Sequence, residues 1–180
     1  MTGAPDFWVF GYGSLVFNPG MELAETRRAT LHGYRRRFCM WSIHHRGSEE
    51  DPGLVLALEP HADAICTGLA MRPADPGPAL AALRERELIS SAYHEVTVSL
   101  VTDDGGRIES LAYVIDLDHQ QYARDLSLEQ QAAIIAKAEG GRGPNHEYLT
   151  HAVDGLAKLG VRDEELDWLV ARVQQMRAAS

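Results

Sequence analysis

The chain has 180 residues, a length that fits one compact domain with its own hydrophobic core, and we expect a single domain over residues 1–180. A net charge of −9 and an isoelectric point near 5.3 exclude the Lys- and Arg-rich surface that binds nucleic acids or anionic membranes. The N-terminal residues do not resemble a secretory signal and no stretch of roughly 18 apolar residues is present, so we expect a cytoplasmic protein, of undetermined oligomeric state.

The first predicted element is a short buried strand over residues 7–10, which runs into the turn Gly11-Tyr12-Gly13-Ser14-Leu15. The turn begins like a dinucleotide-binding motif, but Val16 replaces the third glycine and no helix is expected to open at residues 18–20. Ser14 also lacks the glycines of a serine-hydrolase nucleophile, because Tyr12 lies two residues before it and Val16 two residues after it. Two interpretations stay open: a structural turn, or a turn whose backbone N–H groups bind an anion.

Further strands are predicted over residues 31–41, 54–58 and 66–71, where glycines and prolines separate apolar runs. The basic cluster Arg35-Arg36-Arg37 lies in the first of them, and we interpret it as a solvated strand face rather than a phosphate site. Cys39 and Cys66 are too few for a disulfide framework. We interpret them as buried strand residues rather than as catalytic thiols.

A helix predicted over residues 75–89 interrupts the strands, with Leu80 and Leu83 on one face. At about 100° per residue, Glu87 falls within roughly 20° of Leu80, whereas Glu85 lies about 140° away. Burial of a carboxylate raises its pKa, so Glu87 is a candidate general acid or base. The alternative is a structural ion pair with Arg84, which lies on nearly the same face.

Residues 93–101 alternate as a half-buried strand does, and Asp103-Asp104-Gly105-Gly106 predicts a hairpin turn into a strand over residues 108–115. The second half of the chain is predicted to be helical, with Ser127 as an N-cap, Gly160 as a stop, and helices over residues 128–138, 146–159 and 163–176. A mostly antiparallel sheet followed by helices indicates an α+β fold.

The histidines and glycines give no support to a metal or nucleotide site. His146 and His151 are five residues apart and would project about 140° from each other on a helix, unlike the spacing of four in a zinc helix. The chain also lacks the phosphate-binding loop of nucleotide hydrolases. We therefore expect no metal and no cofactor.

The sequence resembles the ChaC-type gamma-glutamylcyclotransferases, which act on glutathione. The resemblance extends over nearly the whole chain. It rests on these motifs and their order: residues 9–15 (Val-Phe-Gly-Tyr-Gly-Ser-Leu), His45-Arg46-Gly47, Pro52-Gly53, Gly68 and Ala70, Arg86-Glu87-Leu88 with Tyr93, Ser127-Leu128-Glu129-Gln130, Gly143-Pro144-Asn145, and Glu147-Tyr148-Leu149. Each motif alone is weak, but their order and spacing together are specific.

The resemblance implies a mixed, mainly antiparallel β-barrel with flanking helices, and it maps the catalytic glutamate of the family onto Glu87. The implied reaction cyclises the gamma-glutamyl group of glutathione and releases 5-oxoproline and cysteinylglycine. The resemblance also implies that the turn holds the gamma-glutamyl end of the substrate. Our candidate substrate-binding residues are the turn residues Tyr12, Gly13, Ser14 and Leu15, together with Arg46 and Tyr148. The helical phase of residues 75–89 selects Glu87 over Glu85 independently of the family resemblance.

Two other functions stay open at this point. The first keeps the cyclisation but acts on a different gamma-glutamyl amino acid or a gamma-glutamyl amine. The second is a noncatalytic module that uses the turn to bind a small carboxylate; the presence of Glu87 favours an enzyme over this module.

Overall fold

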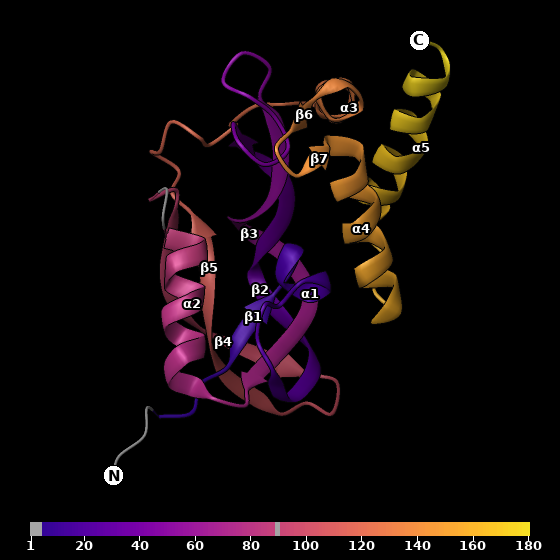
Figure 1. The fold of residues 1–180 in the computed structure, drawn as a ribbon. Helices are drawn as coiled ribbons and strands as arrows, with labels where there is room; N and C mark the ends of the chain where they lie inside the picture. Colours follow the sequence, from indigo (N-terminus) through magenta and orange to yellow (C-terminus); the bar gives the residue numbers. More distant parts are fainter. Residues whose placement is uncertain (1–4, 89–90) are drawn as a thin grey trace. The chain divides into compact units, whose positions relative to one another are not determined.

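A computed structural model describes residues 5–88 and 91–180 of the chain (Figure 1). The chain divides into two compact units, one containing residues 1–36 and 58–119 and the other residues 37–57 and 120–180. The long strands β2 (Leu23–Ser42) and β3 (Gly53–Pro73) each contribute residues to both units. The single domain expected over residues 1–180 stays a prediction.

The first unit contains a closed barrel with the strand order β1-β3-β2-β4-β5. Strand β1 is antiparallel to β3, and β4 is antiparallel to β5, whereas β1 and β5 are parallel. Helix α2 packs against β4 (Figure 1). The predicted mixed, mainly antiparallel barrel with helices is thereby confirmed. The bounds of the remaining elements of this unit are β1 (Val9–Gly11), α1 (Ser14–Phe17), α2 (Pro76–Leu88), β4 (Tyr93–Thr102) and β5 (Arg107–Ile115).

The predicted hairpin between β4 and β5 is confirmed, with register pairs running from Tyr93↔Ile115 to Val101↔Arg107. Gly105 has a φ of +86°, a conformation that glycine adopts readily because it has no Cβ. The turn closes through a hydrogen bond of 2.8 Å from the Thr102 backbone amide to the carbonyl oxygen of Gly106.

The strand boundaries differ from those predicted. The strands expected over residues 54–58 and 66–71 are parts of the single strand β3, and the strand expected over 31–41 lies within the longer β2. Residues 60–63 of β3 are exposed, so the apolar pattern lapses there while the strand continues around the barrel. The helix expected over residues 75–89 is α2, and its predicted last residue, Ile89, lies outside the described residues. The one-turn helix α1 was not predicted.

A cluster of buried side chains connects the elements around the first turn of the chain. It consists of Val9, Leu15, Met71, Leu83 and Tyr113, which come from β1, α1, β3, α2 and β5. Leu88, near the end of α2, packs against this cluster. The turn after β1 and the helix that carries Glu87 therefore share one hydrophobic core.

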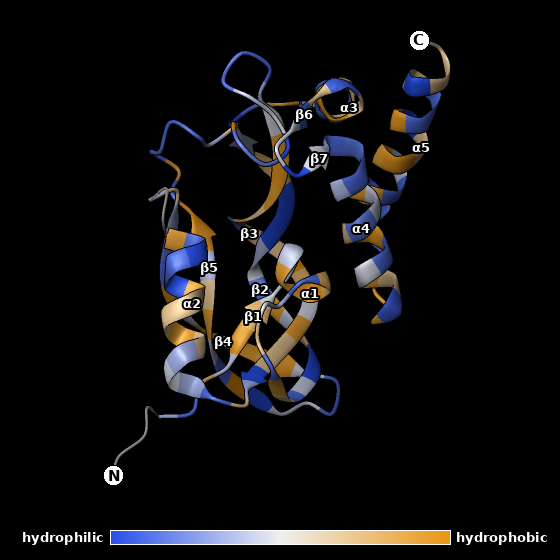
Figure 2. Cartoon of the chain, viewed as in Figure 1, coloured by the Kyte–Doolittle hydropathy of each residue, from blue (hydrophilic) through white to orange (hydrophobic). Residues whose placement is uncertain are grey.

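The second unit contains three long helices, all within two residues of their predicted limits: α3 (Leu128–Lys137), α4 (Asn145–Lys158) and α5 (Glu164–Ala178). Two short strands, β6 (Glu139–Gly140) and β7 (Gly143–Pro144), pair between α3 and α4. Helices α4 and α5 alternate between hydrophilic and hydrophobic segments in Figure 2, as expected of amphipathic helices.

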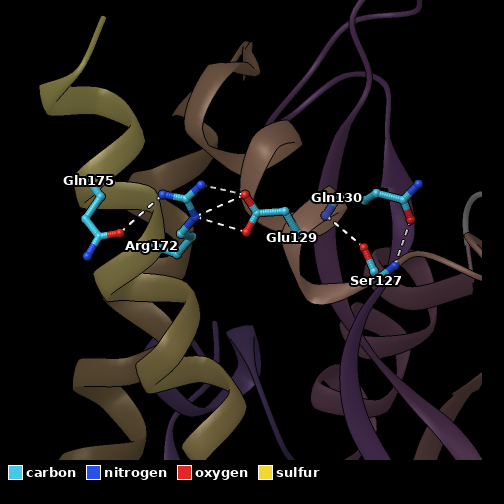
Figure 3. Close-up of polar contacts among 5 residues, drawn as sticks. All are labelled: Ser127, Glu129, Gln130, Arg172 and Gln175. Carbon is cyan, nitrogen blue, oxygen red and sulfur yellow. Dashed lines mark hydrogen bonds and ion pairs between the residues drawn. The ribbon is translucent and has the colours of Figure 1, made fainter.

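The start of α3 is fixed by two sets of polar contacts (Figure 3). Ser127 Oγ accepts the Gln130 backbone N–H at 3.1 Å, and Gln130 Oε1 accepts the Ser127 backbone N–H at 2.9 Å, which together form a capping box. Arg172 of α5 pairs with Glu129 of α3 at 2.6 Å. The predicted N-cap at Ser127 is confirmed.

None of the helices in residues 5–88 and 91–180 has the length and apolar character needed to cross a membrane.

Candidate functional site

The turn after β1 is held close to β3. A Cβ built on Gly68 of β3 would lie 2.2 Å from the carbonyl oxygen of Gly11, and a Cβ built on Gly11 would lie 2.7 Å from the Met71 side chain. Only glycine therefore fits at residues 11 and 68 without a shift of neighbouring atoms. This packing explains why a glycine ends β1 at the point where the chain turns toward Ser14.

Helix α1 follows directly, with Gly13 as its N-cap residue. The Val16 amide donates to the carbonyl oxygen of Gly13 at 2.9 Å. The amides of Ser14 and Leu15 precede it in the first turn, where a helix provides no intrahelical acceptor. The predicted contact of these N–H groups and that of Gly13 with an anionic ligand stays a prediction.

Tyr12 is buried, and both its side-chain hydroxyl and its backbone carbonyl group form hydrogen bonds. Its hydroxyl donates to the carbonyl oxygen of Tyr113 at 3.4 Å, and its own carbonyl oxygen accepts Nη1 of Arg36 at 2.7 Å. Arg36 also donates to the carbonyl oxygen of Thr67. Tyr12 therefore fixes the approach of the chain to the turn, and its predicted contact with a substrate stays a prediction.

The interpretation of the basic cluster at residues 35–37 as a solvated strand face is wrong for two of its three members. Arg36 and Arg37 are buried, and Arg37, in the second unit, donates to the carbonyl oxygens of Ala123 and Arg124 at 3.1 and 2.8 Å. Backbone carbonyls satisfy these guanidinium groups, so the arginines lie inside without a phosphate. The interpretation of Cys39 and Cys66 as buried strand residues is confirmed.

Glu87 lies in the last turn of α2, and its side chain is 12% exposed. Glu85, two residues earlier on the same helix, is exposed, so the helical-phase argument is confirmed. Burial raises the pKa of the Glu87 carboxyl, and the charge of Arg86 opposes this by lowering it. A carboxyl with a raised pKa can both accept and donate a proton near neutral pH.

The expected alternative partner of Glu87, Arg84, binds elsewhere. Its guanidinium donates to both carboxylate oxygens of Glu95 on β4, at 3.0 and 2.9 Å. Glu95 also accepts the Tyr113 hydroxyl at 3.0 Å. Burial and the neighbouring carboxylates Glu95 and Glu87 raise the pKa of the Tyr113 phenol, which therefore stays neutral.

Arg86 connects the two predicted halves of the site, a role that the sequence did not indicate. Its guanidinium contacts Ser14 and Asn18 at the turn and lies 3.4 Å from Glu87 Oε1. Residue spacing along α2 indicates which side chains share its face, but not which element meets them there. The only sequence signal for Arg86 is its place beside Glu87 in the motif Arg86-Glu87-Leu88, which does not indicate what Arg86 contacts.

The other two predicted residues, Arg46 and Tyr148, lie in the second unit and contact each other. The Arg46 guanidinium lies 5.8 Å from the centre of the Tyr148 ring and donates to the carbonyl oxygen of Pro144 at 3.1 Å. The Tyr148 hydroxyl accepts the backbone N–H of Leu56 at 3.1 Å. Both side chains have roles within this unit, and their contact with a substrate stays a prediction.

The possible metal ligands of residues 5–88 and 91–180 are dispersed. No cluster of three or more His, Cys, Asp or Glu side chains that would hold a metal ion is found there.

Comparison with known proteins identifies close relatives over most of the chain. The family model described as ChaC-like protein matches residues 7–176. The glutathione-specific gamma-glutamylcyclotransferase of Escherichia coli strain K12 is 35% identical over 95% of this chain and 74% of its own length. The human glutathione-specific gamma-glutamylcyclotransferase 1 is 31% identical over 94% of this chain and 79% of its own length. The sequence resemblance is thereby confirmed.

A solved structure supports the same fold. The crystal structure of a gamma-glutamylcyclotransferase from yeast, described as specific to glutathione, superposes with a TM-score of 0.87. The match covers 97% of this chain and 98% of the yeast chain at 22% sequence identity. At this identity the likeness concerns the fold alone.

Proposed function

The chain belongs to the ChaC-like family, and from this premise we propose that it is a gamma-glutamylcyclotransferase that acts on glutathione. In the proposed reaction, the alpha-amino nitrogen of the gamma-glutamyl group attacks its own gamma-carbonyl carbon. A carbon–nitrogen bond forms to close a five-membered lactam, and the bond to the cysteine nitrogen breaks. The products are 5-oxoproline and cysteinylglycine, and the proposed location of the reaction is the cytoplasm.

The observation that carries the proposal is the largely buried Glu87 carboxyl with its raised pKa, on a helix that shares one core with the turn. The alpha-amino group of the substrate is an ammonium ion near neutral pH and must lose a proton before it attacks. Glu87 takes this proton as a general base and delivers a proton to the departing amine as a general acid. A pKa raised toward neutrality suits both steps.

The turn supplies the second part of the mechanism. The backbone N–H groups of Gly13, Ser14 and Leu15 bind the alpha-carboxylate of the substrate or the oxyanion that develops on the gamma-carbonyl oxygen. Because nucleophile and electrophile belong to one molecule, holding the gamma-glutamyl chain in a folded conformation provides much of the acceleration. The packing of Gly11 against β3 keeps the turn in place for this task.

The test is incubation of the purified protein with glutathione, followed by detection of 5-oxoproline and cysteinylglycine. We expect both products in equal amounts, with initial rates higher than on gamma-glutamyl-alanine under the same conditions. A preference for gamma-glutamyl-alanine would refute glutathione as the substrate and favour another gamma-glutamyl compound, with the same reaction. If calorimetry shows that glutathione binds and no product forms, the proposed enzyme activity is refuted in favour of a noncatalytic module that binds a small carboxylate.

A further inference from the structure

Arg86 contacts three residues, each through a different nitrogen atom of its guanidinium group. Nη1 donates to the carbonyl oxygen of Asn18 at 2.6 Å, and Nη2 donates to Ser14 Oγ at 3.2 Å. Nε lies 3.4 Å from Oε1 of Glu87. The first two partners lie in and just after α1, whereas the third is the neighbouring residue on α2. One side chain thus connects the turn to the end of the helix.

The planar guanidinium gives these contacts a fixed mutual geometry. Its donors lie in one rigid fork, so the positions of Asn18, Ser14 and Glu87 around it are coupled. The Arg86 side chain is 30% exposed, compared with 52% for Arg84 two residues earlier. The ion pair between Arg86 and Glu87 is therefore less exposed than the pair between Arg84 and Glu95, whereas the hydrogen bond from Arg86 to Asn18 is exposed.

Given the proposed function, we propose that Arg86 is the positioning residue of the site, which fixes the turn to α2 and holds Glu87 as its counter-charge. Both α1-side partners are neutral oxygen atoms, so they orient the guanidinium without neutralising it. The positive charge is directed at the Glu87 carboxylate. The proposal deepens the assigned reaction by adding the group that aligns proton transfer with substrate binding.

The contact with Ser14 has a second consequence. Because Ser14 Oγ accepts a hydrogen bond from Arg86, its own O–H proton is left to donate elsewhere. A hydroxyl in this state is a donor for a carboxylate or an oxyanion, in addition to the backbone N–H groups of the turn. Arg86 thereby orients the Ser14 hydroxyl as a donor for an anion, and its charge also lowers the pKa of Glu87.

The titratable groups around Glu87 in the described residues lie on three elements, α2, β4 and β5. On α2, Arg86 lowers the pKa of Glu87 against the effect of burial. On β5, the Tyr113 phenol stays neutral and donates to Glu95 of β4, whose charge is matched by Arg84. Helix α1, residues 14–17, contributes no titratable side chain. Removing the charge of Arg86 therefore raises the pKa of Glu87.

The test compares Arg86→Met, Arg86→Gln and Arg86→Lys with the wild type, with the exposed Arg107→Met as the control for loss of a remote positive charge. The first readout is the titration of the Glu87 side-chain carboxyl by NMR in the ligand-free protein. We expect the midpoint to rise by about one pH unit or more in the methionine and glutamine variants and to stay near the wild-type value in the lysine variant. The Arg107 variant should titrate like the wild type.

The second readout is the pH profile of kcat/KM on glutathione. The acid limb should move upward with the NMR midpoint, so that the loss of activity is largest at low pH and partly recovers at higher pH. Arg86→Lys should keep the profile but raise KM, because a single ammonium cannot maintain the fork. The glutamine variant provides the same comparison if the methionine variant does not fold.

These experiments distinguish failure of the proposed function from failure of the proposed role of Arg86. Absence of glutathione turnover in the wild type refutes the proposed function, while the NMR titration still decides the role of Arg86. An unchanged Glu87 midpoint in both uncharged variants, or a uniform loss of activity at every pH, refutes the positioning role while the reaction stands.

Discussion

Replacement of Glu87 by glutamine separates a catalytic carboxyl from a structural one, because the two predict opposite effects on stability. The side chain is 12% exposed, and burial is the larger of the two influences on its pKa, ahead of the opposing charge of Arg86. A carboxylate in this position therefore costs folding free energy at neutral pH. Glu87→Gln removes this charge while keeping nearly the same size and shape.

The sign of the effect depends on pH in a defined way. Well below about pH 4.3, the ordinary value for glutamate, folded and unfolded chains both carry the proton and Glu87 contributes no pH dependence. As the pH rises, the unfolded chain loses its proton first, so wild-type stability falls until the raised pKa of the folded state is passed. Each unit by which the pKa is raised corresponds to about 1.4 kcal/mol.

We expect Glu87→Gln to raise the free energy of unfolding at pH 7 by an amount on the order of 1 kcal/mol, and to lose this advantage at pH 4. The same variant should lose at least about a hundredfold in turnover of glutathione. Urea denaturation at both pH values and 5-oxoproline release measure the two effects. Glu85→Gln, on the exposed face of the same helix, is the matched control and should change neither.

A Glu87→Gln variant that is less stable than the wild type at pH 7 would refute the argument from burial and identify Glu87 as one half of a structural ion pair. Near-normal product release by the same variant would refute the proposed mechanism independently.

Three further substitutions test the packing and capping that the structure shows. Asn145→Ala should lower the free energy of unfolding by about 2 kcal/mol or more in urea, since Leu54 loses partners for its buried N–H and C=O at 2.8 and 2.7 Å. Gly68→Ala should lower the free energy of unfolding by about 1–3 kcal/mol and also reduce turnover, because its Cβ would meet the Gly11 carbonyl oxygen at 2.2 Å. A melting temperature equal to that of the wild type would contradict the predicted clash. Ser127→Ala should lower stability by about 1 kcal/mol without changing kcat, and an equal urea midpoint would show that the capping box contributes nothing.

The sequence predicted those features that depend on local spacing. The phase of Glu87 against Glu85 follows from the geometry of one helix, and the hairpin at Gly105 follows from one turn. The cap at Ser127 is equally local, since both of its hydrogen bonds span three residues. Each of these features is decided within a few residues of the chain, so a pattern in that window is sufficient.

The features that the sequence did not predict depend on closure of the barrel or on contacts between distant segments. The burial of Arg36 requires the carbonyl oxygens of Tyr12 and Thr67, which lie 24 and 31 residues away. The contacts of Arg86 with Asn18 and Ser14 span 68 and 72 residues. A charged residue in a strand is usually exposed, and only the tertiary fold supplies acceptors that reverse this tendency.

Glu95 binds the arginine that helical spacing offers as a partner for Glu87. Two arginines, Arg84 and Arg86, precede Glu87 on α2, and a cation beside a carboxylate stabilises the charged form and lowers its pKa. Because β4 places Glu95 within 2.9 and 3.0 Å of the Arg84 guanidinium, that charge is matched on the barrel side of the helix. Arg86 is left as the cation beside Glu87, and its effect is smaller than that of burial. The raised pKa on which the proposed chemistry depends therefore follows from the burial of Glu87 in the last turn of α2, which outweighs the charge of Arg86.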